Sequence, residues 1–342
     1  MRENYRPWDV DIGVFPKEGN NGGQLKFILQ FAVLAPSGHN SQPWEFSVSD
    51  DTIEVWANEE RSLARSDPDR RQLLIAIGCA IENILIAADY YGLESTVHYL
   101  PRGHQKNLIA VMNFQNRGTT KSHDKNHLIF SIPHRLTNRG KYKQDAPPRH
   151  FLEELRKFSG NDFEVAVITE KEKRHKIADV ACAAQIEVME FDSFREELSH
   201  YIKHNFTKSK TGMPGFTLGL PAPISLIASH LIKRINMSKK SAKQDEKLLK
   251  EFTPAFVVIS SAHDNPINRI KAGQIFERIW LLATREQLSC APLAAPVQVG
   301  DYYKNVQEIL GTKSRPLVFF RLGHSDKIPR HSPRFSVEEV LK

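Results

Sequence analysis

Two segments of the chain, residues 69–91 and 268–287, carry apolar side chains at the i, i+3, i+4 spacing of an α-helix. Both are apolar on nearly every face, which predicts helices that are buried all round. They also match each other at a constant offset of 195 (273 minus 78), which pairs Gly78, Glu82, Ala88 and Leu93 with Gly273, Glu277, Ala283 and Leu288. This correspondence favours an internal duplication.

The segments around these two helices predict the remaining elements. Alternation of apolar and polar residues predicts strands at 94–100, 108–114 and 316–322, and a hairpin of 45–49 with 52–57. Gly92 stands where a helix C-cap glycine is expected. Further patterns predict a helix at 23–34, a helix after Pro147 and Pro148, a strand at 163–168, a helix at 170–191 and a strand at 255–261. The fold class is therefore α+β, with helices packed around a mixed sheet.

A long insertion, residues 195–253, interrupts the second half before its strand at 255–261. It is rich in glycine and proline between 212 and 223 and is followed by a basic amphipathic stretch. Loops of this length in compact domains are usually functional or disordered. We expect a lid over a site, and a plain surface excursion is the alternative.

Composition narrows the class of protein. Of the 342 residues, 40% are hydrophobic and 25% are charged, as in a globular protein with a sizeable core. The net charge of +7 suits an anionic small molecule, but the basic residues are dispersed outside 233–250 and no nucleic-acid-binding signature is present. We therefore expect no nucleic-acid partner.

The cysteines and the apolar stretches limit the location and the chemistry. Cys79, Cys182 and Cys290 are far apart and form no C-x-x-C pair, so neither a disulfide framework nor a zinc site is predicted. Residues 1–19 lack the apolar core of a signal peptide, and residues 218–232 are too short to span a bilayer. A cytoplasmic protein without a membrane partner is the default expectation.

The most specific stretch, Ala35-Pro36-Ser37-Gly38-His39-Asn40-Ser41-Gln42-Pro43-Trp44, lies between a predicted helix and a predicted strand. Pro36 ends the helix, and the residues after it favour a turn. The side chains of residues 40–42 offer several donors and acceptors, and Trp44 anchors the exit by burial. Such a loop can hydrogen-bond the polar edge of a flat heterocycle, or it can satisfy only its own backbone.

The pattern P-S-x-x-N-x-Q-P-W resembles the FMN-binding loop of the nitroreductase superfamily, and the chain carries every fixed position. The resemblance covers nearly the whole chain, is weakest at 195–253, and fits the fused two-copy, mycobacterial Acg-like branch. It implies that the loop contacts FMN through Pro36, Ser37, Gly38, His39, Asn40 and Gln42.

Two further segments carry the same resemblance. Residues 134–142 resemble the superfamily's R-x-(S/T)-x-R-x-x-(F/Y) segment, which implies phosphate and ring contacts from His134, Arg135, Thr137, Asn138 and Arg139, in a register uncertain by one residue. The closing segment implies a phosphate contact from Arg330 or Arg334, with Arg334 favoured by its spacing to the Glu pair. Pro292 and Leu293 stand where the superfamily has a Gly-Leu-Gly turn, and the absence of those glycines puts their contact in doubt.

The two expected halves, residues 1–130 and 131–342, keep complementary pieces of this site. The resemblance therefore implies one FMN per chain and a monomer that is its own pseudo-dimer. It implies an oxidoreductase that passes electrons from NAD(P)H through FMN to a small nitro-aromatic, quinone or similar acceptor, with no protein acid or base required and no metal. The alternative is an FMN-sequestering protein whose closed lid leaves little reductase activity.

Overall fold

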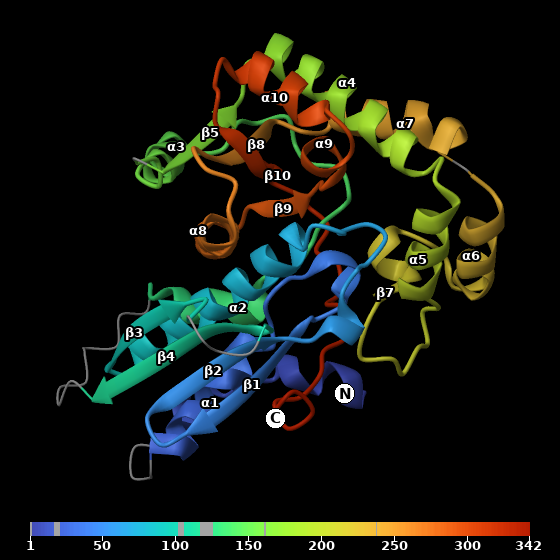
Figure 1. Ribbon diagram of the computed structural model, residues 1–342. Coiled ribbons are helices and arrows are strands. Elements are labelled where there is room, and N and C mark those ends of the chain that lie inside the picture. Colours follow the sequence, from blue (N-terminus) through green and yellow to red (C-terminus); the bar gives the residue numbers. More distant parts are fainter. Residues whose placement is uncertain (1, 17–20, 102–105, 117–125, 161, 237) are drawn as a thin grey trace.

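The computed structural model describes residues 2–16, 21–101, 106–116, 126–160, 162–236 and 238–342. Two four-stranded sheets lie on either side of a central pair of long helices, α2 (Arg71–Tyr90) and α8 (Pro266–Arg285) (Figure 1). Both helices begin and end close to the bounds that their apolar spacing predicted. Their burial on nearly every face explains why that spacing has no polar side.

Each sheet is antiparallel. In both sheets the strands lie side by side in the order first, second, fourth, third, counted along the chain. The first has the order β1 (Trp44–Ser49), β2 (Thr52–Ala57), β4 (Leu108–Asn116), β3 (Leu93–Tyr99). The second has the order β5 (Phe163–Ile168), β8 (Ala255–Ser261), β10 (Arg315–Gly323), β9 (Ser289–Pro292). In each case the long helix follows the second strand in the chain and precedes the third, so α2 and α8 occupy equivalent positions.

Parallel bridges join segments that are distant in the chain to these sheets. Leu341 forms a parallel bridge with Phe46 of β1, where the Phe46 amide donates to the Val340 carbonyl at 2.8 Å. Thr137 forms a parallel bridge with Cys290 of β9. The expected α+β class with mixed strand pairing is confirmed. The last residues of the chain therefore pack against the first sheet, and residue 137 packs against the second.

The main core is continuous across both sheets and both central helices. It includes Ile77 and Ile81 of α2, Ile279 and Trp280 of α8, and strand residues from each sheet. Among the described residues, only α2 is long and apolar enough to cross a bilayer, and 78% of that apolar window is buried inside the protein. Its apolar character is therefore that of a core helix.

The remaining helices surround this core. They are α1 (Asn21–Ala32), α3 (Arg149–Arg156), α4 (Lys171–Val188), α9 (Ala295–Gln298) and α10 (Tyr302–Leu310), with short 3-10 helices η1 (Glu3–Trp8), η2 (Ile12–Val14), η3 (Gly38–Asn40), η4 (Glu59–Arg61) and η5 (Leu128–His134). Gly92 has a φ of 77°, as its expected role at the end of α2 requires.

Two expectations differ from the structure. The insertion at 195–253, described apart from Met237, is largely helical rather than irregular. It contains α5 (Asp192–Tyr201), η6 (Gly215–Leu218), α6 (Ala222–Arg234), α7 (Ser238–Glu251) and the parallel pair β6 (Ile202–Lys203) with β7 (Met213–Pro214). Pro292 and Leu293 were expected at the position of a turn, but Pro292 is the last residue of strand β9 (Ser289–Pro292). Pairing with β10 overrides the weak local pattern of this short segment.

Candidate functional site

The polar loop between α1 and β1 is held in an unusual backbone conformation. His39, Asn40 and Gln42 have φ values of 50°, 59° and 53°, in the left-handed region that non-glycine residues rarely adopt. The Gln42 amide donates to Ser37 Oγ at 2.9 Å, and Trp44 is fully buried at the start of β1. Such backbone outliers cluster at functional sites, where the surrounding contacts must hold them in place.

The two amide side chains of this loop bind other segments of the chain. Asn40 Nδ2 donates to the carbonyls of Gly212 at 3.1 Å and Pro333 at 2.9 Å. Gln42 Nε2 donates to the Lys210 carbonyl at 2.7 Å, and Gln42 Oε1 accepts from the Phe335 amide at 3.0 Å. Both amides therefore tie the insertion and the C-terminal segment to the loop.

Two residues of the 134–139 segment, Thr137 and Asn138, contact β9. The Asn138 amide donates to the Cys290 carbonyl at 3.0 Å, and Asn138 Nδ2 donates to Ser289 Oγ at 3.1 Å. Asn138 is buried, His134 and Arg139 are exposed, and Thr137 is half-buried. Within this segment only Arg135 and Asn138 are buried.

Arg135 is a buried structural cation. It is 2% exposed, its Nη2 donates to the Leu34 carbonyl at 2.6 Å, and its Nε lies 3.2 Å from Glu277 Oε1. Burial raises the pKa of Glu277 to about 7, and the charge of Arg135 opposes that rise. The guanidinium also lies over the Trp280 ring, 4.6 Å from its centroid.

Arg334, which the sequence favoured for a phosphate contact, is also committed to internal partners. It is 4% exposed, its Nη1 donates to Asn40 Oδ1, and its Nη2 donates to the carbonyls of Leu34 and Ala35 at 3.4 and 3.3 Å. Trp8 covers it, with the guanidinium carbon 4.7 Å from the ring centroid. Its donors hold the loop, the end of α1 and the C-terminal segment together.

Arg139 and Arg330 differ from these two buried arginines because both are exposed. Arg139 Nη1 donates to the Thr217 carbonyl at 3.4 Å, and Arg330 lies over the Phe216 ring, 4.0 Å from its centroid. Both therefore face η6 of the insertion. Partial enclosure by the protein lowers the pKa of Arg139. A guanidinium stays charged under these conditions, so two charged side chains contact η6 of the insertion.

Two histidines of the site are neutral at pH 7. Burial lowers the pKa of His39 to about 4, Glu197 opposes this shift, and Arg139 adds to it. Burial, followed by the charges of Arg334, Arg135 and His134, lowers the pKa of His331 to about 3. His331 stacks on Trp8 with the ring centroids 3.9 Å apart.

The predicted residues thus divide into two groups. The buried group has its polar atoms directed to internal partners and consists of Asn40, Gln42, Arg135, Asn138 and Arg334. The accessible group consists of Pro36, Ser37, Gly38, His39, His134, Thr137, Arg139, Pro292, Leu293 and Arg330. The hydrogen bonds above join four segments, namely the loop, residues 134–139, the C-terminal segment and the insertion. Pro292 belongs to β9, which is bridged to residue 137.

Sequence reasoning missed Trp8, His331, Met213 and Phe216. Trp8 Nε1 donates to the Ser332 carbonyl at 2.8 Å, so η1 covers the C-terminal segment. Met213 Sδ lies 3.7 Å from Arg139 Nη2. The glycines and prolines around residue 215 could have directed attention to Phe216, but no local signal marked Trp8.

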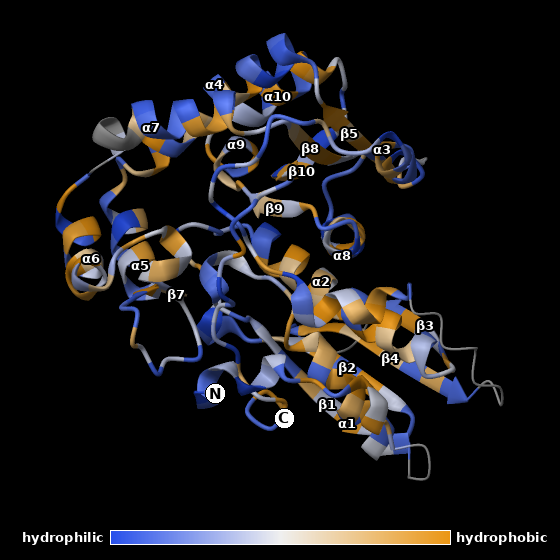
Figure 2. Ribbon diagram, turned by 180° about the vertical axis from the view of Figure 1, so that it is seen from behind, coloured by the Kyte–Doolittle hydropathy of each residue, from blue (hydrophilic) through white to orange (hydrophobic). Residues whose placement is uncertain are grey.

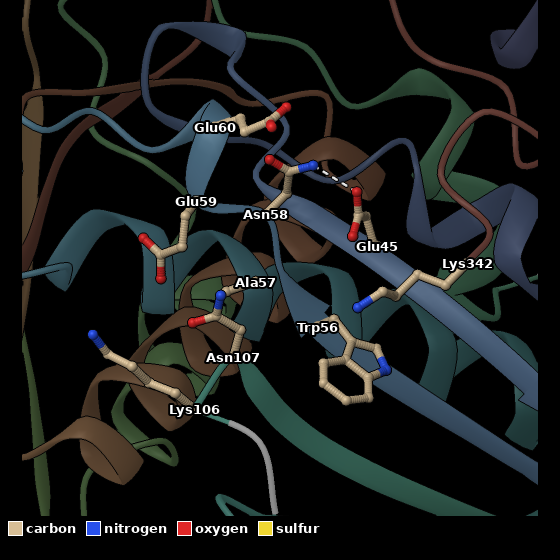
Figure 3. Close-up of a pocket in the computed structure, with 9 residues that line it drawn as sticks. All are labelled: Glu45, Trp56, Ala57, Asn58, Glu59, Glu60, Lys106, Asn107 and Lys342. Atoms are coloured by element: carbon tan, nitrogen blue, oxygen red, sulfur yellow. Dashed lines mark hydrogen bonds between the residues drawn. The ribbon is translucent and has the colours of Figure 1, made fainter.

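A separate hollow of about 510 Å³ lies beside the β1–β2 hairpin (Figure 3). Its lining mixes charges of both signs, from Glu45, Glu59, Glu60, Lys106 and Lys342. Asn58 Nδ2 donates to Glu45 Oε1 at 2.6 Å across it. None of the predicted site residues lines this hollow, so the candidate site is the region described above.

Comparison with known proteins places this arrangement in context. No family model matches the chain. A protein of Mycobacterium tuberculosis (strain ATCC 25618 / H37Rv), provisionally named NAD(P)H nitroreductase Rv3131, is 23% identical over 329 residues, covering 93% of this chain and 91% of its own. Probable NAD(P)H nitroreductase PigM of Serratia sp. (strain ATCC 39006) is 23% identical over 338 residues, covering 93% and 92%.

A solved structure extends the similarity to the fold. A protein from Anabaena variabilis ATCC 29413, provisionally described as a nitroreductase, superposes with a TM-score of 0.54 at 12% identity over 92% of this chain and 91% of its own. The match includes both sheets and the central helices, because it extends over nearly the whole length. Over nearly its whole length, this chain is therefore similar in sequence to proteins named as NAD(P)H nitroreductases, and it shares the fold of the Anabaena variabilis protein.

Proposed function

We propose that the chain binds one FMN per molecule in the region between residues 36–42, 134–139 and 330, and acts as an NAD(P)H-dependent oxidoreductase. The observation that carries the proposal is the pair of exposed cations, Arg139 and Arg330, that both contact η6 of the insertion, while the charge of Arg139 also acts on His39 of the polar loop. Guanidinium groups bind phosphate with two parallel hydrogen bonds, so this pair suits the terminal phosphate of FMN.

The remaining accessible residues fit the same cofactor. Ser37 Oγ accepts from the Gln42 amide, so its hydroxyl proton can be donated to a ligand. The Thr137 hydroxyl lies on the neighbouring segment, fixed by the bridge to Cys290. The donor set therefore combines two cations with hydroxyl groups, which matches a phosphate, a polyhydroxyl chain and a polar ring edge.

FMN supplies the hydride and electron transfer when it is bound, and the protein supplies binding, orientation and charge. Asn40, Gln42 and Arg334 position the loop from behind through their internal hydrogen bonds. His39 is neutral at pH 7, so it adds no third cation to the site. The substrate class that we propose is a small nitro-aromatic, quinone or similar acceptor.

The equal strand order of the two sheets supports an internal duplication in which the chain is its own pseudo-dimer. The loop belongs to the first half and residues 134–139 and 330 to the second, so one site is completed per chain. We therefore infer a monomer. The insertion contacts Arg139 through Thr217 and Arg330 through Phe216, and we infer that it is the lid of this site.

The test is anaerobic reduction of the FMN-loaded protein by NADH and by NADPH, followed by loss of the oxidised flavin absorbance. The proposal predicts reduction by at least one nucleotide. A loaded protein that stays oxidised with both would contradict the reductase function.

A second candidate is FMN sequestration under a closed lid. The hydrogen bonds from Asn40 to Gly212 and from Gln42 to Lys210 favour it, because they hold the lid to the loop. Shortening residues 208–240 distinguishes the two functions. Sequestration predicts faster flavin release and new reactivity with nicotinamide, whereas a working reductase predicts activity before the change.

A further inference from the structure

Helix α6 presents an apolar face to solvent. Ile224, Ile227 and Leu231 recur at intervals of three and four residues, which places them on one side of the helix, and Ile235 follows directly after its last residue. They are 47%, 53%, 39% and 45% exposed. We call these four residues the α6 stripe. Figure 2 shows apolar residues of α6 at the periphery of the molecule, away from the two sheets.

The α6 stripe is not the face by which the helix packs on the protein. Ser225 and Ala228, on the adjoining face of α6, are buried, and Ala228 packs with Ile202 and Met213 in a small separate core. Ser225 Oγ accepts from the Asn205 amide at 3.0 Å, which fixes the start of the helix. A surface helix is normally polar on its outer side, so the second apolar face calls for a partner.

Charge identifies the kind of partner. Residues 195–253 contain eleven Lys or Arg and five Asp or Glu, an excess of six that accounts for nearly all of the chain's net +7. Arg234 ends α6 after Lys233, which pairs with Glu196 at 2.7 Å, and exposed Lys243 follows on α7. The apolar stripe therefore lies within the most cationic part of the chain.

We propose that α6 docks the protein on an anionic membrane surface, with the α6 stripe at the boundary between headgroups and acyl chains and the flanking cations on lipid phosphates. A second copy of the chain fits less well, because two such insertions in contact would bring their positive charges together. We expected no membrane partner because the sequence showed no membrane-spanning segment outside the core. Docking on a membrane surface does not require a spanning segment.

The test is co-sedimentation of the full chain with phosphatidylcholine vesicles that contain phosphatidylglycerol, and with vesicles of phosphatidylcholine alone. The proposal predicts binding to the anionic vesicles that weakens at high salt and is far weaker on the neutral ones. The double variant Ile227→Ser with Leu231→Ser lowers the partition coefficient by about tenfold or more. Arg234→Gln lowers it by about fivefold.

Matched controls separate docking from general effects. Val14→Ser removes an apolar side chain that is 62% exposed elsewhere, and Lys313→Gln removes an exposed charge outside the insertion. Both should bind as the unaltered chain does, and far-UV circular dichroism should show that every variant is folded. Equal binding to neutral vesicles, or no binding to anionic ones, overturns the proposal. Self-association that the double variant abolishes, without vesicle binding, assigns the stripe to a second copy instead.

Discussion

Gly78 of α2 and Gly273 of α8 face each other where the two central helices cross. A Cβ on Gly78 would lie 2.0 Å from the Ile270 carbonyl oxygen, and one on Gly273 would lie 2.1 Å from the Ile75 carbonyl oxygen. The two contacts are equivalent at the 195-residue offset (270 minus 75). The close approach joins the helices that carry the two sheets, and it requires a residue without a side chain at both positions.

Replacing Gly78 by Ala should therefore destabilise the protein, because backbone atoms of α8 must move to admit the methyl group. We expect the free energy of unfolding to fall by about 1–3 kcal/mol in denaturant titration, as for overpacked cores. Gly160→Ala is the control, since an added Cβ there meets nothing within 4 Å. Equal stability of Gly78→Ala and the unaltered chain would contradict the close crossing.

The assignment of Arg139 and Arg330 to the phosphate makes a specific prediction for flavin affinity. Each change to Ala should weaken FMN binding by about tenfold to a hundredfold, the value of a charge-assisted hydrogen bond. Binding of riboflavin, which lacks the phosphate, should change little. Fluorescence quenching on titration measures both affinities. Exposed Arg156 serves as the control position. A similar loss for both flavins would show that these arginines act elsewhere.

Gln42 connects the loop to the insertion and to the C-terminal segment. Gln42→Ala leaves the Lys210 carbonyl and the Phe335 amide without these partners, so we expect a loss of about 1–3 kcal/mol in unfolding free energy. Flavin release, followed by stopped-flow fluorescence, should become faster. Gln115→Ala, at an exposed position on β4, should alter neither quantity. Unchanged release in the Gln42 variant would argue against a lid held by the loop.

His331 should make the protein sensitive to acid. Its pKa is about 3 in the folded protein, against an ordinary value of 6.5. Between these values the unfolded chain binds a proton that the folded protein does not, so stability rises with pH up to about 6.5 and then levels off. The slope from this one group is at most about 1.4 kcal/mol per pH unit.

His331→Phe keeps an aromatic ring against Trp8 and removes the titrating group. Urea titrations at several pH values should then show a shallower loss of stability in acid than the unaltered chain shows. His200→Phe, at an exposed position on α5, provides the comparison. An unchanged acid slope in the His331 variant would mean that other groups account for it.

Periodicity identified the regular parts of the fold well. The apolar spacing located α2 and α8, and alternation located the β1–β2 hairpin, because both signals follow from burial of a whole face. It failed for β9, where four residues are too few for a pattern, and for the insertion, whose glycines and prolines concealed α6. The offset between Gly78 and Gly273 was visible in the sequence, but the contact between them was not.

The sequence indicated which segments form the candidate site, but it did not indicate which of their side chains are exposed and which are buried. Sequence spacing favoured Arg334 for the phosphate, whereas its guanidinium is enclosed by Asn40 and the end of α1. An arginine can reach a ligand only if it is not buried. The segment that encloses Arg334 lies about 300 residues away from it in the chain. Trp8 could not have been found for the same reason, since it reaches the site through contacts with 331–334.

We propose that each chain completes a single flavin site from its two halves. The most direct test is the amount of FMN bound per chain after reconstitution and gel filtration, from visible absorbance and from release on denaturation. We predict a value of about one, which falls strongly when Arg139 and Arg330 are both replaced by Ala. A value near two, or no bound flavin in excess FMN, would contradict the account.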